Sequence, residues 1–257
     1  HAARDAGCNL LENNLVTEAI FDVVTGTWLV RAQDSKDENV KYEYRARVLI
    51  CADGATSGLA RYLGVLPKDC EPQAVCSRQY WLAGEDNFNA DGVCYYPSYM
   101  IPGYAAVFRE SNNQCNFLTY IIPGGALKNE DLKSAHEKLL DNDLANILNK
   151  GKHAEEMKSA SLRLGGIDVS HGNHLLVIGD ACGLIDPLSG EGIHHAMCSG
   201  KYAAEVIQEA FTKKDWTARV MKKYDARWKK EFELDFFWST TIASMITKFP
   251  WFMDAAA

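Results

Sequence analysis

The sequence of 257 residues lacks the features of several common classes of protein. Its eight cysteines include no C-x-x-C pair, and zinc and iron–sulfur sites usually draw ligands from such pairs, so neither kind of metal site is expected. Its formal net charge of −7 argues against a nucleic-acid-binding protein, whose surface would be basic. No apolar run approaches the ~20 residues that a membrane-spanning helix needs. These absences do not exclude contact with a membrane or a lipid through an apolar face.

The composition is that of a globular protein. Hydrophobic residues make up 47% of the chain and charged residues 24%, as in ordinary soluble domains. The length suffices for one large domain or two ordinary ones with a real core. Several cysteines lie within apolar runs, where cysteine acts as a small hydrophobic residue, and this favours a reducing, cytoplasmic location.

The first part of the chain predicts an antiparallel meander. Residues 14–23, 27–32 and 40–52 alternate apolar and polar side chains and are separated by short polar turns. Residues 48–51 are continuously apolar, as in a strand buried on both faces. A short helix should follow, with Ser57 as its N-cap and Gly64 as its stop. We assign residues 1–66 to one part of a first domain.

Residues 67–161 differ in character and predict a second, antiparallel-sheet domain inserted into the first. Five of the seven prolines fall here, beside aromatic strands such as "YWLAG" and "GYAAVF". Residues 111–113 predict a hairpin turn, and residues 129–157 predict two helices.

The first domain should resume over residues 162–212. Residues 175–178 predict a strand, and apolar or small residues then recur at helical spacing on one face: Ile193, Ala196, Met197, Gly200, Ala203, Ala204 and Ile207. Residues 213–257 predict a helical, strongly aromatic tail. Its aromatic spacing suits buried helices and a peripheral membrane contact equally well.

The segment "LLVIGDACGLIDPLSGEGIHHAMCSG", residues 175–200, predicts a ligand site. A strand runs into Gly179-Asp180, and two glycines, Gly190 and Gly192, precede a helix. Helix N-termini carry unpaired N–H groups and roughly half a positive charge, and glycine lets a flat ligand touch the backbone. Asp180 could accept hydrogen bonds from ligand hydroxyls. A reduced flavin fits this combination better than a bare phosphate, because it joins sugar-like hydroxyls to an electron-rich ring edge. Each feature taken singly could equally be a turn.

Together with "VLICADGATSGLARYLG" upstream, this segment resembles the flavin-contacting motifs of the geranylgeranyl reductase family, within the FAD proteins that include the aromatic hydroxylases. "SLRLGGI", "YDARWKKEFELDF" and "KFPWFMDAAA" also resemble that family, particularly its archaeal lipid type. The resemblance covers most of residues 48–66 and 161–257. It implies an α/β fold: the C-terminal part of a Rossmann-like FAD-binding domain, an inserted antiparallel-sheet substrate domain and a helical C-terminal tail.

The resemblance also implies roles for particular residues. Asp180 would bind the ribityl and pyrophosphate region of FAD. The ring would be lined by Pro187, Gly190, Glu191, Gly192 and Ile193, and Asp53 and Gly54 would close the site from the other side. The aromatic strands of the inserted domain would wall a prenyl-chain pocket through Tyr95, Tyr96, Tyr99, Tyr104 and Phe108.

The sequence departs from the family pattern in two places. The family's N-terminal G-x-G-x-x-G, which holds the ADP part of FAD, does not occur, so the chain is expected to be a fragment with an incomplete FAD site. The family's Y-x-W-x-F-P keeps Tyr104 and Phe108 but has Ala106 and Arg109 in place of Trp and Pro. This leaves the exact prenyl substrate open.

The reaction that the resemblance implies is reduction of C=C bonds in geranylgeranyl chains, most naturally those of archaeal-type membrane glycerolipids. An electron donor, a nicotinamide, a ferredoxin or another flavin, would reduce the FAD. The proton donor is not identified: His194 and His195 titrate in the useful range, but core packing explains them better. Two alternatives stay open, a flavin monooxygenase or halogenase on the same scaffold, and a non-catalytic remnant or interaction module.

Overall fold

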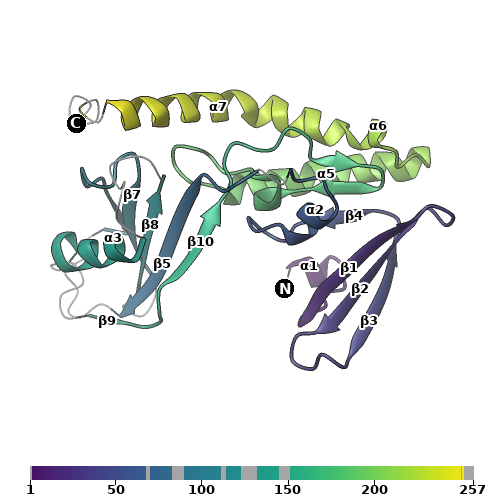
Figure 1. The fold of residues 1–257 in the computed structure, drawn as a ribbon, viewed down its shortest axis with the longest axis horizontal. Helices are drawn as coiled ribbons and strands as arrows, with labels where there is room; N and C mark the ends of the chain where they lie inside the picture. Colours follow the sequence, from purple (N-terminus) through teal and green to yellow (C-terminus); the bar gives the residue numbers. More distant parts are fainter. Residues whose placement is uncertain are drawn as a thin grey trace.

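The computed structural model describes residues 2–67, 70–82, 90–110, 114–122, 132–144, 151–249 and 251. These residues form three β-sheets and a set of helices, the longest of which lies along one edge of the molecule (Figure 1). A short helix α1 (Ala2–Asp5) precedes the first sheet.

The first sheet is the meander that the alternation predicts. Strands β1 (Asn14–Asp22), β2 (Thr27–Asp34) and β3 (Lys41–Ala46) pair antiparallel in that order. Gly26 turns the chain between the first two with φ +63°, a conformation that glycine adopts without strain.

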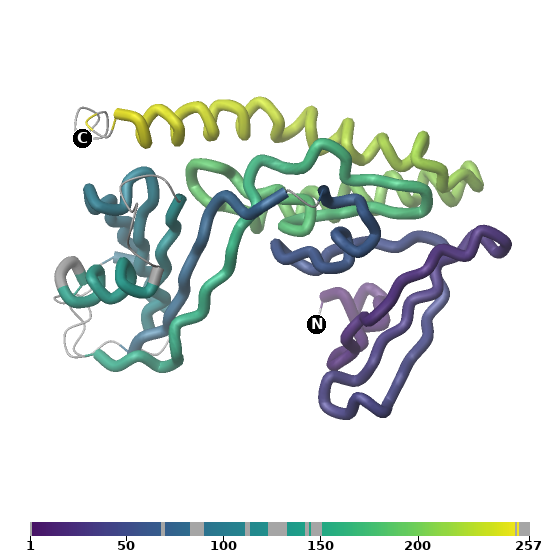
Figure 2. Tube along the Cα trace, in the orientation of Figure 1, coloured from purple at the N-terminus to yellow at the C-terminus, as the bar shows by residue number. Residues whose placement is uncertain are grey.

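The end of the third predicted run crosses into a different sheet. Strand β4 (Leu49–Cys51) lies parallel to β12 (Leu175–Val177), and β11 (His171–Gly172) pairs antiparallel on the other side of β12. Segments far apart in the sequence therefore lie side by side (Figure 2). The prediction that this run is buried on both faces was wrong: Cys51 is buried, but Ile50 is 40% exposed because its face of the strand opens on a cavity.

Helix α2 (Gly58–Tyr62) follows β4, and its cap differs from the predicted one. Ser57 has φ +43° and makes no capping hydrogen bond. The carboxylate of Asp53 does so instead, with Oδ2 accepting from the Leu59 amide at 2.9 Å. Gly64 ends the helical segment with φ +70°, as expected.

The second and largest sheet is antiparallel, with strand order β10-β5-β8-β7-β6 and β9 paired to β5. Its strands are β5 (Ala74–Leu82), β6 (Gly92–Tyr95), β7 (Tyr104–Arg109), β8 (Gln114–Ile121), β9 (Lys152–His153) and β10 (Lys158–Leu162). The predicted hairpin turn at 111–113 lies outside the described residues, but the strands on either side of it pair antiparallel as predicted. Of the two helices predicted for 129–157, the structure describes α3 (Leu132–Lys138), which continues into a π-helical turn η1 (Leu139–Asp143). Lys152–His153 is strand rather than helix, and residues 145–150 lie outside the description.

After β12 the chain makes a short 3₁₀ turn, η2 (Gly179–Cys182), and then forms α5 (Ile193–Lys213), α6 (Ala218–Met221) and α7 (Lys223–Lys248). Of the residues that share one predicted face of α5, Ala203 is buried, but Ala204 is exposed and so are two residues at the start of the helix. Ile193 is 78% exposed and Met197 is 72% exposed, because this end of the helix borders a cavity. Among the helices of the described residues, none combines the length and apolarity needed to span a bilayer.

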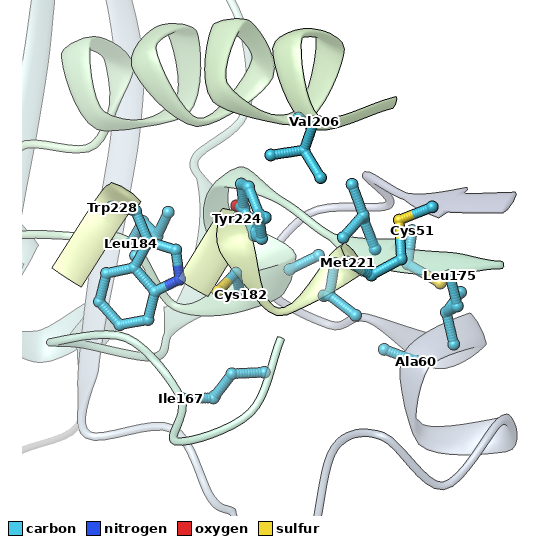
Figure 3. Close-up of a cluster of buried hydrophobic side chains, with 14 of the residues drawn as sticks. Cys51, Ala60, Ile167, Leu175, Cys182, Leu184, Val206, Met221, Tyr224 and Trp228 are labelled. Carbon is cyan, nitrogen blue, oxygen red and sulfur yellow. The ribbon is translucent and has the colours of Figure 1, made fainter. Parts of the chain in front are cut away.

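The main core joins the parallel strands to the C-terminal helices (Figure 3). One buried cluster contains Cys51 and Leu175 from the sheet, Val206 from α5, and Tyr224 and Trp228 from α7. Fully burying a side chain such as Val206 contributes about 1.5–3 kcal/mol to stability. The first and last parts of the chain therefore share one core.

A buried polar cluster fastens α7 to β11. The Asp225 carboxylate accepts hydrogen bonds from Ser170 Oγ at 2.7 Å and from the Ser170 amide at 3.3 Å, and lies 2.9 Å from His171 Nδ1. Trp228 Nε1 donates to Ser170 Oγ at 3.0 Å. Because these hydrogen bonds join residues before β12 to two residues of α7, the cluster holds the start of α7 against β11.

A second buried polar cluster lies between α3 and the large sheet. Gln79 Oε1 accepts a hydrogen bond from Trp81 Nε1 at 3.0 Å, which identifies this atom as the amide oxygen. It lies 3.0 Å from His136 Nε2, and because an amide oxygen can only accept, Nε2 must be the donor. His136 Nδ1 is therefore the unprotonated nitrogen, and it accepts from Ser77 Oγ at 2.9 Å. Ser77 also bonds Thr119 on the neighbouring strand. Burial disfavours the charged imidazole and lowers the pKa of His136 to about 4.

Stability should consequently fall in mild acid. The folded-state pKa of His136 lies below its unfolded value near 6.5, so its contribution is complete above pH ~6.5 and is lost as the pH falls towards about 4. By pH ~5 the loss from this residue should be about 2 kcal/mol. Urea unfolding at pH ~7.5 and ~5 measures this loss in the free energy of unfolding. The free energy of unfolding of the His136→Gln variant should fall less between these two pH values. His153→Gln, at a half-exposed histidine, is the control; an equal drop in the His136 variant contradicts the assignment.

Candidate functional site

The segment between β12 and α5 forms one wall of a cavity of about 540 Å³, here called the central cavity. This volume lies within the range of small-molecule sites. The large sheet forms the facing wall through Cys76, Arg78, Tyr104, Leu118 and Tyr120. The segment after β12 contributes Asp180, Gly190, Gly192, Ile193, Ala196 and Met197.

The loop of residues 186–191 is held by a carboxylate that the sequence reasoning missed. Asp186 Oδ1 accepts from the Leu188 amide at 3.0 Å and from the Ser189 amide and hydroxyl at 2.7 and 2.9 Å. Its Oδ2 accepts from Ser239 Oγ of α7 at 2.6 Å. Burial alone would raise the pKa of Asp186, but the hydrogen bonds from Ser239 and Ser189 outweigh it and leave the pKa below its usual value. The carboxylate thus stays ionised and locks the loop to α7. The Asp-Pro-x-Ser spacing, typical of an Asx turn, was the available signal.

Two tyrosines of the large sheet hold the same loop from the other side. Tyr104 donates its hydroxyl to the Ser189 carbonyl at 2.6 Å, and Tyr120 donates to the Pro187 carbonyl at 3.0 Å. Burial, followed by the nearby Cys94 and other acidic groups, raises the pKa of Tyr104 to about 12, and burial likewise raises that of Tyr120. Both phenols therefore remain protonated donors. The loop is fixed before any ligand arrives.

The glycines at the cavity are required by close packing. Gly190 has φ +70°, and a Cβ there would lie 2.8 Å from the Tyr120 ring. A Cβ on Gly192 would lie 3.1 Å from Ile185 Cγ1 and 3.3 Å from Asp180 Oδ1. Both positions thus leave backbone, rather than side chain, on this wall of the cavity.

Asp180 lines the central cavity from the turn η2. Burial raises the pKa of its carboxyl. Its backbone carbonyl accepts from the Gly183 amide at 2.9 Å, so the turn does not depend on the side chain. The Asp180 carboxyl is therefore available for a ligand.

The side chains of Glu191, His194 and His195 serve the helix rather than the cavity. Glu191 Oε1 accepts from the His194 amide at 2.8 Å, and Oε2 lies 2.8 Å from His195 Nδ1. The His195 ring packs on Phe232 and on Phe236 of α7, at 4.7 and 5.0 Å between ring centroids. Neither histidine lines the central cavity. The packing role preferred from the sequence holds for His195, whereas His194 is exposed.

Asp53 lies apart from the central cavity. It caps α2 and lines a different cavity of about 630 Å³, between the meander and β4. Gly54, beside it, has φ +75° and open space around its Cβ position. The structure thus brings together Asp180, Gly190, Gly192 and Ile193 of the predicted cofactor residues, and places Asp53 and Gly54 elsewhere.

The predicted substrate residues divide into two groups. Tyr96, Tyr104 and Phe108 line a cavity of about 430 Å³ together with Leu188, Ser189 and Ile246 of α7, here called the tyrosine cavity. Tyr95 and Tyr99 instead pack against the core between α3 and the large sheet. Tyr104 borders both the central and the tyrosine cavities. A further cavity of about 330 Å³, the α7 cavity, lies beyond Pro187 against Thr240, Ala243, Ser244, Thr247 and Lys248.

Comparison with known sequences identifies relatives that carry two different names. No family model matches the chain. Conditioned medium factor receptor 1 of Dictyostelium discoideum is 42% identical over 258 residues, covering 100% of this chain and 50% of that protein. Digeranylgeranylglycerophospholipid reductase 1 of Methanopyrus kandleri is 31% identical over 216 residues, covering 81% of this chain and 56% of that protein. The chain belongs to the geranylgeranyl reductase family. It spans about half the length of the curated relatives that it matches.

Solved structures confirm the predicted fold class. A geranylgeranyl bacteriochlorophyll reductase-like protein from Thermoplasma acidophilum superposes with a TM-score of 0.78 at 23% identity, covering 95% of this chain and 60% of that one. The flavin-dependent halogenase CmlS gives a TM-score of 0.66 at 18% identity, covering 90% and 42%. Members of the geranylgeranyl reductase family and flavin-dependent halogenases therefore share this fold.

Proposed function

We propose that the full-length protein containing this chain is an FAD-dependent reductase that saturates C=C bonds in the geranylgeranyl chains of a membrane glycerolipid. The central cavity supports this proposal most directly. The glycine wall and the aromatic sheet touch where Gly190 packs on Tyr120, and beside this contact the cavity is lined by Gly192 and the start of α5, where a ring could lie. The carboxyl of Asp180 in the same lining suits the hydroxyls of a ribityl chain. The residues present therefore fit FAD.

When bound and reduced, FAD supplies a hydride. The chain's own residues would hold the ring in place and exclude water from it. The rigid loop 186–191, held by Asp186, Tyr104 and Tyr120, would keep the ring at one place against the sheet. The start of α5, after its N-cap Gly192, would present the positive end of a helix dipole to the ring's electron-rich edge, a contribution of ~1 kcal/mol. The Gly190 amide does not take part, because it donates to the Asp186 carbonyl at 2.9 Å within the loop.

The prenyl chain would lie in the tyrosine cavity. An isolated alkene accepts hydride poorly, so alignment and exclusion of water must lower the barrier. Tyr104 borders this cavity and the central one, so a chain in the tyrosine cavity can approach a ring in the central cavity. The relatives named as digeranylgeranylglycerophospholipid reductases support a glycerolipid as substrate.

Turnover of the full-length protein tests this proposal. Anaerobic protein reduced with dithionite should convert geranylgeranyl glycerophospholipid into products that gain two hydrogen atoms for each double bond, as seen by mass spectrometry. Oxygen consumption with a hydroxylated product would instead establish a monooxygenase.

A second candidate is a signalling or interaction protein without catalysis. It is favoured by one observation, the name of the 42% identical relative, a receptor. The absorption spectrum of the purified full-length protein separates the two. Stoichiometric bound flavin supports the reductase, and a colourless protein that does not take up added FAD supports the interaction protein.

A further inference from the structure

Helix α7 carries a row of exposed apolar side chains along its outer face. Leu234, Trp238, Ile242, Met245 and Phe249, here called the outer stripe, recur at helical spacing and are 67%, 54%, 41%, 44% and 50% exposed. Phe236, Ala243 and Ile246 of the same helix are buried on the other side. Contiguous apolar patches of this kind mark interaction surfaces on otherwise soluble proteins.

The charge along this part of the helix is unusual for the chain. Residues 236–249 contain no acidic residue, and Lys248 is their one cation, although the whole chain has a net charge of −7. A protein partner chosen by ion pairs would find little here to recognise. The composition instead matches the faces of interfacial helices, in which Trp, Phe and other apolar residues enter the boundary between lipid headgroups and acyl chains.

The position of α7 also points to a lipid bilayer as the partner of the outer stripe. Figure 1 shows α7 along one edge of the molecule, with the other elements on one side of it. Thr240, Ala243, Ser244 and Thr247 line the α7 cavity, and Ile246 lines the tyrosine cavity. The same two turns of helix thus separate the cavities from the outer stripe. A lipid leaving a bilayer at the stripe would need to pass only around one helix to reach them.

We propose that the outer stripe of α7 docks on a lipid bilayer and positions the adjacent cavities to take the prenyl lipid directly from the membrane. The helix lies in the plane of the interface, and the stripe from Trp238 to Phe249 covers about 16 Å of it. Binding is driven by apolar contact, so zwitterionic phosphatidylcholine suffices and salt has little effect. The proposal rests on the proposed function for the identity of the lipid, but the docking itself does not require turnover.

Flotation of the full-length protein with phosphatidylcholine vesicles tests the docking. The double variant Trp238→Glu with Met245→Glu should lower the vesicle-bound to free ratio at least about tenfold, because carboxylates enter apolar surroundings at high cost. Val23→Glu with Val24→Glu is the matched control. It adds the same charge to two valines that are 81% and 91% exposed in the β1–β2 turn, and it should bind vesicles as the parent does.

Further measurements distinguish a lipid bilayer from the other partners that could cover the outer stripe. Raising NaCl from about 0.1 to 1 M should leave flotation unchanged, because the bound state contains no ion pairs to screen. The proposal is overturned if the parent does not float, which would show that the rest of the protein covers the stripe. It is also overturned if the stripe variant floats normally. If light scattering then shows that the substitutions convert a dimer into a monomer, a second copy of the chain covers the stripe. Failure of the reductase assay with normal flotation refutes the proposed function alone.

Discussion

Asp180→Ala in the full-length protein should yield a folded but colourless protein. The carboxyl lines the central cavity and its turn is held by backbone hydrogen bonds, so the substitution removes a ligand contact without removing a structural one. Losing a hydrogen bond to a charged group costs about 1.5–3 kcal/mol, or roughly a 10- to 150-fold weaker Kd for FAD. The absorbance of bound flavin and a fluorescence titration with FAD measure this directly.

Stability provides the second readout of that variant. Burial raises the pKa of Asp180, so its ionised form is unfavourable in the ligand-free protein, and the melting temperature of the apoprotein should stay the same or rise. Asp168→Asn, at an exposed aspartate on the preceding loop, should bind FAD as the parent does. An Asp180→Ala protein that keeps stoichiometric FAD removes this residue from the cofactor site.

Gly190→Ala should both destabilise the protein and impair cofactor binding. Two physical terms act together: a left-handed φ of +70°, worth about 1–2 kcal/mol for a residue with a Cβ, and a Cβ placed 2.8 Å from the Tyr120 ring. Because Tyr120 is buried and bonded to the Pro187 carbonyl, the ring cannot move without releasing the loop. We expect a total loss of about 2–4 kcal/mol in urea unfolding and at least a tenfold weaker FAD affinity.

Gly200→Ala, within helix α5, is the control. Its Cβ would meet nothing within 4 Å, and alanine favours helix, so stability should rise by up to about 1 kcal/mol. The contact with Tyr120 is tested by the double variant Gly190→Ala with Tyr120→Ala. The combined loss should be smaller than the sum of the two single losses, and simple additivity would rule out the ring contact as the cause.

The histidines show what the sequence leaves open and the tertiary contacts decide. The sequence offered His194 and His195 both as candidate proton donors and as packing residues. The position of α7, with Phe232 and Phe236 against the His195 ring, decides for packing at His195, whereas His194 is exposed. His136, which the sequence did not distinguish from any helical histidine, proves to be buried.

Asp53 shows that one carboxylate can have two uses. The family resemblance made it a candidate for the cofactor site, which stays a prediction, and the structure shows it as the cap of α2. A motif of a few residues cannot distinguish the two, because both uses need a carboxylate beside free amides. The predicted domain boundaries, at residues 66, 161 and 212, stay predictions.

The sequence by itself determined the elements that depend on neighbours in the chain. It predicted the meander, the β7–β8 pairing, a strand over 175–178 (observed at 175–177) and the helix beginning after Gly192, because alternation, turn residues and glycine conformations act over a few residues. Tertiary structure alone decided which of these residues share a cavity. Asp186, Ser239, Tyr104 and Tyr120 are brought together from a loop, a helix and two strands, and no local pattern records a contact between segments so far apart. The same holds for the outer stripe, since the packing of the rest of the molecule decides which face of an apolar helix stays exposed.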